Sequence, residues 1–256
     1  GVTRMPYDGS LGDDVDTAEM LETMLSNPSS GIEAPAAIIL EVVQGEGGLN
    51  AARPEWVKRI AEIARAHGAL LIIDDIQAGC GRTGGFFSFD GMDVKPDLVT
   101  MAKSLSGFGL PLAAVLVRPE HDVLGPAEHN GTFRGNNHAF VTARAALETY
   151  WADDAFREGA EARARLLEER LTRISKRIPG SRLKGRGMMR GVDVGSGDLA
   201  SEICKACFAE GLIIETSGAH DEVVKVLAPL NIDLDLFTRG LDILEEAVDQ
   251  RMESTR

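Results

Sequence analysis

The strongest constraint on the fold of this chain is a strand–helix–strand pattern in its first third. One apolar run covers Ala36–Val43, and a second, Leu70–Ile73, is apolar at every position. Between them a helical pattern begins at Pro54 and ends at Gly68, as expected because proline favours the first helical turn and glycine follows the last. Continuously apolar strands joined by a helix pair in parallel, so the pattern predicts an α/β sheet covered on both faces.

Two further apolar runs, Leu98–Met101 and Leu112–Val117, extend this sheet, and we expect both to be buried strands. Beyond Asn137 the pattern changes to helices at 139–151, 156–177 and 234–252 and strand-like pieces at 189–194, 212–215 and 223–227. This tail predicts a separate α+β domain. We place the two domains at residues 1–148 and 149–256.

Charge and composition narrow the class of protein. The formal net charge is -13, and a field of that sign repels nucleic acid and anionic membranes, so we expect neither as a partner. No apolar stretch reaches the ~20 residues of a membrane helix, and the first residues lack the pattern of a signal peptide. We therefore expect a cytoplasmic enzyme.

The cysteines and histidines do not have the spacing of a metal site. Cys204 and Cys207 form a C-x-x-C, but they lie in a helical pattern without a second pair of ligands, which favours buried helix cysteines. His129 and His138 also lack a partner at ligand spacing. We expect no metal.

Polar groups follow the predicted parallel strands where each strand ends. Asp74 follows the second strand and Lys103 follows the third. Ligands of open α/β sheets bind at the carboxyl ends of the strands. Pyridoxal chemistry requires this pair, because a lysine bonds the cofactor aldehyde and a carboxylate keeps the pyridine nitrogen protonated.

Three motifs carry a resemblance to a known family. Residues 74–84, DDIQAGCGRTG, resemble the D-E-[VI]-Q-x-G-x-G-R-T-G signature of the class III, or ornithine/GABA-type, aminotransferases, which depend on pyridoxal 5'-phosphate. Residues 102–111, AKSLSGFGLP, are similar to the family's lysine segment, and residues 131–137, GTFRGNN, to its T-F-x-G-N run. The resemblance implies the transferase fold type I, here with part of the large domain followed by the small domain.

Within this family, variants at 74–77, 104–111 and 128–138 resemble the diaminobutyrate–2-oxoglutarate aminotransferases of ectoine synthesis. The resemblance implies transfer of an amino group from glutamate to aspartate 4-semialdehyde, which gives L-2,4-diaminobutyrate and 2-oxoglutarate. Three alternatives stay open: a diaminobutyrate enzyme that feeds another product, another omega-aminotransferase acting on ornithine, acetylornithine or 4-aminobutyrate, and a catalytically silent fragment. Family members are longer at the amino end, and their phosphate-binding glycine loop lies in that additional segment. We therefore expect part of the cofactor site to be missing from this sequence.

The resemblance also assigns roles to individual residues. Lys103 bonds the cofactor and moves the substrate proton, while Asp74 pairs with the pyridine nitrogen and Gln77 lies beside the phenolic oxygen. Thr132 resembles the threonine that binds the phosphate of the neighbouring subunit's cofactor, which implies a homodimer or a dimer of dimers.

A substrate gate is expected at Glu46 and Lys225. Glu46 matches a glutamate that covers a carboxylate-binding arginine in relatives, but Lys225 stands at the arginine's place. Because lysine lacks the bidentate fork of arginine, a gate of different geometry is implied, and a solvated loop glutamate is the alternative for Glu46.

Overall fold

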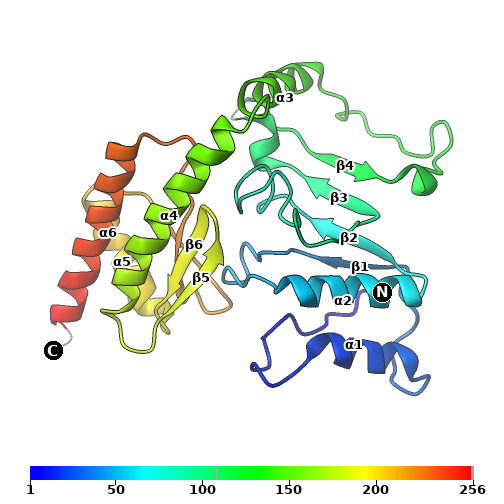
Figure 1. The fold of residues 1–256 in the computed structure, drawn as a ribbon, viewed down its shortest axis with the longest axis horizontal. Coiled ribbons are helices and arrows are strands. Elements are labelled where there is room, and N and C mark those ends of the chain that lie inside the picture. The colour runs from blue at the N-terminus through cyan, green and yellow to red at the C-terminus, as the bar shows by residue number, and fades with distance from the viewer. Residues whose placement is uncertain (108, 255–256) are drawn as a thin grey trace. The chain divides into compact units, whose positions relative to one another are not determined.

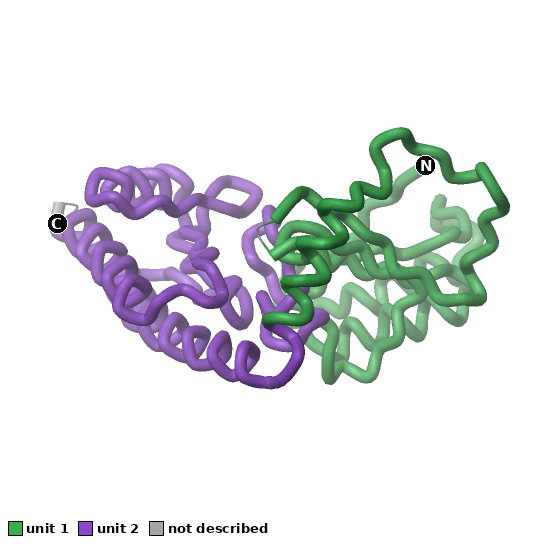
Figure 2. The backbone as a smooth tube through the Cα atoms, turned by 90° about the horizontal axis from the view of Figure 1, so that it is seen from above, with its two compact units in different colours: residues 1–42, 52–77, 89–149 green, residues 43–51, 78–88, 150–256 purple. Residues whose placement is uncertain are grey.

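The computed structural model describes residues 1–107 and 109–254, so Phe108, in the middle of the run 102–111, lies outside the described residues. The chain divides into two compact units, which Figure 2 shows in different colours. The first unit comprises 1–42, 52–77 and 89–149, and the second comprises 43–51, 78–88 and 150–256. Segments 43–51 and 78–88 therefore belong to the second unit, whereas a boundary after residue 148 assigns them to the first.

A four-stranded sheet organises the first unit (Figure 1). Its strands run in the order β1 (Ala37–Leu40), β2 (Leu70–Asp74), β3 (Leu98–Met101) and β4 (Ala114–Val117). The first three strands are parallel, and β4 is antiparallel to β3. The predicted α/β fold with a mostly parallel sheet is therefore confirmed.

Helix α2 (Pro54–Ala66) is the crossover between β1 and β2. Proline occupies its first turn, where the missing N–H costs no hydrogen bond, and Gly68 beyond its end has φ +67°, which suits glycine. Its buried face carries Val57, Ile60 and Ile63, which share a core with Leu71 of β2. Burial of this apolar stripe ties the helix to the sheet.

Helix α1 (Thr17–Ser26) was not predicted from the sequence. The Asp16 carboxylate caps it by accepting hydrogen bonds from the backbone N–H groups of Ala18 (2.9 Å) and Glu19 (3.1 Å). The indole N–H of Trp56 on α2 donates to the Thr17 hydroxyl over 2.8 Å. The cap and this buried bond attach α1 to the outer side of α2.

The expectation that the fourth strand is buried was wrong. The side chains of Val115, Leu116 and Val117 are all exposed in β4. The reason is position, because β4 pairs only with β3 and forms an edge of the sheet within the described chain. Composition alone does not separate an apolar edge strand from a central one.

Helix α3 (Asn137–Tyr150) completes the first unit, except for its last residue, which belongs to the second. Two short 3-10 helices lie between β3 and α3: η1 (Lys103–Ser106) follows β3 directly, and η2 (Pro119–His121) follows β4.

The second unit is an antiparallel sheet packed with three helices (Figure 1). Its strand order is β5 (Arg182–Arg186), β6 (Met189–Asp193), β8 (Val223–Val226) and β7 (Glu215–Ser217). The helices are α4 (Ala155–Ser175), α5 (Gly197–Ala209) and α6 (Leu234–Ser254). Their apolar faces form one core, which includes Leu167, Leu171, Ile203, Val224 and Leu244.

Both cysteines of the C-x-x-C motif lie on α5, where Cys207 is buried and Cys204 is half-buried. Burial raises the pKa of the Cys204 thiol to about 11 and that of Cys207 to about 12. Both thiols are therefore protonated at neutral pH, which suits packing groups rather than metal ligands or nucleophiles. Within the described ranges, no helix is both long and apolar enough to cross a membrane.

Asp97 joins three strands at the amino end of β3. Its carboxylate accepts a hydrogen bond from the Leu71 backbone N–H at 2.7 Å and contacts the His121 imidazole at 3.1 Å and the Arg118 guanidinium at 3.5 Å. Burial alone would raise the pKa of Asp97, but the Leu71 and His121 hydrogen bonds and the neighbouring charges outweigh it and lower the pKa.

We expect Asp97→Asn to reduce the free energy of unfolding at pH 7 by about 1 to 2 kcal/mol. Because the pKa of Asp97 is lower in the folded state than in the unfolded state, the ionised carboxylate stabilises the fold at pH values above the usual aspartate pKa of about 3.9. This stabilisation is lost as the pH falls through the pKa of the folded state. Urea unfolding followed by tryptophan fluorescence should therefore show a difference from wild type that shrinks below about pH 4.

The matched control is Asp93→Asn, which removes a carboxylate of the same unit that is 85% exposed and pairs only at the surface with Lys58. Equal losses in the two variants would contradict the role of Asp97.

Candidate active site

Asp74 is the last residue of β2, at the carboxyl end of the strand. It pairs in register with Thr100 of β3, and the next backbone N–H, that of Asp75, donates to the Thr100 carbonyl over 2.9 Å. The Asp74 carboxylate accepts a hydrogen bond from the Ile76 N–H over 3.0 Å. This local turn holds a half-buried carboxylate where the strand ends.

Lys103 opens η1, two residues beyond the end of β3. It follows Thr100 by three residues, so Asp74 and Lys103 emerge from neighbouring parallel strands at the same edge of the sheet. The buried residues Leu105 and Ser106 attach η1 to the unit, and Gly107 ends it in the left-handed region, at φ 59°. The two residues predicted for the cofactor thus lie on adjacent segments at one edge of the sheet.

The expectation that Lys103 lies at a buried strand end needs correction. The residue is exposed, and it begins a helical turn rather than ending the strand. Its backbone has φ +47°, a left-handed conformation that is uncommon for a residue with a side chain. Such conformations persist where the surrounding structure imposes them, and they are frequent at functional sites.

Gln77 and Thr132 differ in their surroundings. Gln77 is half-buried and follows β2 closely, in the same segment as Asp74. Thr132 lies in an exposed turn between β4 and α3, in which the Arg134 N–H donates to the Gly131 carbonyl over 3.3 Å. The neighbouring Phe133 is 99% exposed. The roles of Gln77 and Thr132 towards a cofactor stay predictions.

Arg82, within the R-T-G run, has a structural environment inside the second unit. Its guanidinium donates to the Ala228 carbonyl over 2.5 Å, and its own carbonyl accepts from the Met188 N–H over 2.9 Å. Burial lowers the pKa of the guanidinium to about 10, so it remains charged at neutral pH. These two bonds hold the loop that carries Arg82 in place.

The second unit brings the predicted pair Glu46 and Lys225 together. Lys225 lies in β8 with its side chain fully buried, and its Nζ is 3.2 Å from Glu46 Oε1. A second carboxylate was not predicted: Glu215 Oε1 lies 2.9 Å from the same Nζ. Glu215 pairs with Lys225 across the antiparallel strands β7 and β8, so the register of two short strands is the signal that could have identified it.

Strand β7 also holds the turn that carries Glu46. The Ser217 hydroxyl of β7 donates to the Gly45 carbonyl over 2.9 Å and accepts from the Gly48 N–H over 3.2 Å. The Glu46 carbonyl accepts from the Gly218 N–H over 3.1 Å. The backbone of the turn is therefore attached to β7, while the Glu46 side chain is 78% exposed.

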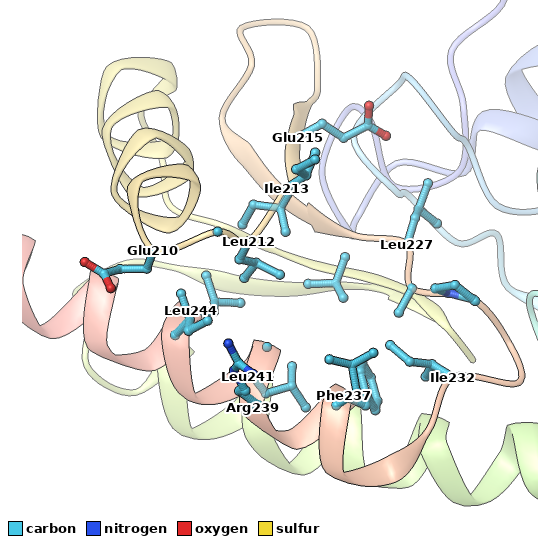
Figure 3. A pocket seen from close by; sticks show the side chains of 18 of the residues that line it. Glu210, Leu212, Ile213, Glu215, Leu227, Ile232, Phe237, Arg239, Leu241 and Leu244 are labelled. Atoms are coloured by element: carbon cyan, nitrogen blue, oxygen red, sulfur yellow. The ribbon is translucent and has the colours of Figure 1, made fainter.

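An apolar cavity of about 550 Å³ lies in the second unit between β7, β8 and α6 (Figure 3). Its walls include Leu212, Ile232, Phe237, Leu241 and Leu244. Glu215 lies at its border with the carboxylate directed away from the labelled apolar side chains. Most of its lining residues are apolar, and Lys225 also contributes to the lining.

The residues at the edge of the first sheet fit one kind of cofactor. A carboxylate held at a strand end can accept the N–H of a protonated pyridine nitrogen, and a lysine amine on the adjacent segment can bond an aldehyde carbon. Within the part of the chain that the structure describes, no group of three His, Cys, Asp or Glu side chains could hold a metal ion.

Solved structures identify the class of fold. The ornithine aminotransferase of Toxoplasma gondii ME49 superposes with a TM-score of 0.82 at 30% identity, over 93% of this chain and 56% of that one. The N-acetylornithine aminotransferase of Stenotrophomonas maltophilia gives a TM-score of 0.74 at 33% identity, over 86% and 57% of the two chains. The fold is that of the fold type I pyridoxal-phosphate-dependent transferases.

The family model of the class-III aminotransferases matches residues 2–248, and the chain belongs to this family. The cofactor of the family is pyridoxal 5'-phosphate. Similar relatives include proteins named diaminobutyrate–2-oxoglutarate transaminase from Vibrio parahaemolyticus, 52% identical over 97% of this chain, and from Halomonas elongata, 53% identical over 96%. The chain spans 59% of the length of each of these two relatives.

We expect Lys103→Ala in the full-length protein to abolish the visible absorbance of lysine-bound pyridoxal phosphate, because the amine that bonds the aldehyde is removed. Spectra after incubation with the cofactor and gel filtration measure this loss. Lys95→Ala, which removes an exposed lysine of the same unit, is the control and should keep the band. A band that persists in Lys103→Ala would contradict the assignment.

Proposed function

We propose that the protein transfers the amino group of glutamate to aspartate 4-semialdehyde, producing 2-oxoglutarate and L-2,4-diaminobutyrate. The proposal is carried by Asp74 at the end of β2 and Lys103 two residues beyond the end of the adjacent parallel strand β3. Membership of the class-III family supports the reaction type. The relatives that bear the diaminobutyrate transaminase name, at 52% to 53% identity, support the substrate pair.

Asp74 and Lys103 of the first unit each have a defined task in this proposal. Bound pyridoxal phosphate supplies an electron sink for the carbanion formed at the substrate carbon. Asp74 keeps the proton on the pyridine nitrogen, which makes that sink effective. Lys103 Nζ removes and returns the substrate proton as general base and acid.

Gln77 and Thr132 complete the first unit's part of the proposal. Gln77 donates near the phenolic oxygen of the cofactor. Thr132, on its exposed turn, donates to the phosphate bound by a second subunit, so the active protein is a homodimer or a dimer of dimers.

Lys225 binds a substrate carboxylate in this proposal, and Glu46 occupies it in the other half-reaction. Glutamate carries a carboxylate on the carbon that gives up its amino group, whereas the reacting aldehyde carbon of aspartate 4-semialdehyde carries none. A buried ammonium needs an anion in either case, and the 3.2 Å contact between Lys225 and Glu46 is consistent with Glu46 taking that place. Lysine binds the anion as a point charge rather than a fork.

Ornithine, acetylornithine or 4-aminobutyrate are the alternative substrates. The structural likeness to ornithine and N-acetylornithine aminotransferases favours ornithine and acetylornithine. The sequence identity to these two enzymes is only 30% and 33%. The higher identity of the diaminobutyrate transaminases makes the semialdehyde the preferred acceptor. Ectoine synthesis is the pathway that we propose for the product.

We expect the full-length protein to form 2-oxoglutarate from glutamate and aspartate 4-semialdehyde with a kcat/KM at least about tenfold above that of any alternative pair. The competing reactions use ornithine, acetylornithine or 4-aminobutyrate as donor and 2-oxoglutarate as acceptor. Coupled detection of 2-oxoglutarate or glutamate measures all of them. A higher kcat/KM with ornithine or 4-aminobutyrate would assign the protein to another branch of the family.

A further inference from the structure

The buried ammonium of Lys225 faces two carboxylates rather than one. The Lys225 side chain is 0% exposed, while the side chains of Glu46 and Glu215 are 78% and 62% exposed. Each carboxylate lies within ion-pair distance of the same Nζ, at 3.2 Å and 2.9 Å. One carboxylate is enough to neutralise the Lys225 ammonium, so the second carboxylate is in excess.

The two carboxylates are held differently. Glu215 lies on β7 directly opposite Lys225 in the antiparallel register, and its strand is hydrogen-bonded to β8. Glu46 lies on a turn whose backbone is attached to Ser217 and Gly218, and its carboxylate is the more exposed of the two and the farther from Nζ. Glu215 is thus the resident partner and Glu46 the exchangeable one.

This difference has an energetic consequence. Removing the partner of a buried charge is strongly destabilising, because the remaining ion has neither water nor a counter-charge. If Glu46 were the single anion near Lys225, its departure would leave such a charge. Glu215 removes this penalty, since Lys225 remains paired while Glu46 moves away.

We propose that Glu215 is a positioning residue that keeps the Nζ of Lys225 paired while the other anion at Nζ is exchanged. The proposal rests on the proposed function for the identity of the exchanging ligand, a substrate carboxylate. The pairing itself belongs to the second unit and is independent of the cofactor. Its consequence is that one anion position at Lys225 is fixed and the other is replaceable.

The test is a charge-removal cycle in the full-length protein, measured by Tm. Glu46→Gln and Glu215→Gln should each change Tm by a few degrees at most, because one carboxylate remains. The double variant should lose roughly 10 °C, well beyond the sum of the single changes. Adding Lys225→Met to the double variant should restore most of the loss, and Glu215→Asp should behave nearly as wild type.

Glutarate, a dicarboxylate without an amino group, provides the readout of exchange. It should raise the Tm of Glu46→Gln more than that of wild type, because its competitor is absent. It should raise the Tm of the double variant further still, because it supplies the missing counter-charge. A variant with Lys225→Met should show no such shift.

Glu210→Gln is the matched control, an exposed glutamate at the end of α5 in the same unit. It should leave both Tm and the glutarate shift unchanged. Additive losses of Tm in the cycle would overturn the proposal, as would an equal glutarate shift after Lys225→Met. The transamination assay fails separately if the proposed function is wrong, so the two failures are distinguishable.

Discussion

The parallel hydrogen bonding of β2 with β3 is the interaction on which the candidate site depends. It sets Asp74 opposite Thr100 and therefore brings the segment that carries Lys103 to the same edge of the sheet. A shift of the register would separate the carboxylate from the lysine and turn the apolar side chains to the wrong face. Burial of α2 against Leu71 and its neighbours stabilises this register by excluding water from one side of the sheet.

The sequence predicted the elements whose apolar pattern is continuous or strongly periodic. The bounds of β2, β3, α2 and α6 agree with the expected ranges to within two residues. Helix α1 was missed because its attachment depends on one cap and on a bond from Trp56, which no local periodicity reveals. Strand β5, with the sequence RLKGR, is defined by its pairing with β6 rather than by an apolar pattern.

The site was predictable to the extent that it is carried by motifs. Asp74 and Lys103 lie in runs whose residue order is distinctive, so the sequence located them without coordinates. Glu215 could not be found in this way, because its relation to Lys225 arises from the pairing of two strands only three and four residues long. The exposed side chain of Lys103 also escaped prediction, since β3 ends before the lysine and a helical turn begins there.

The left-handed backbone at Lys103 places a cost on this position. Glycine adopts φ +47° freely, and a side chain there raises the energy of the folded state by about 1 kcal/mol. A search for greater thermal stability would therefore select glycine at residue 103 and discard the amine. In the proposed function, this position gives up stability for chemistry, and stabilised variants of this chain should be sought elsewhere.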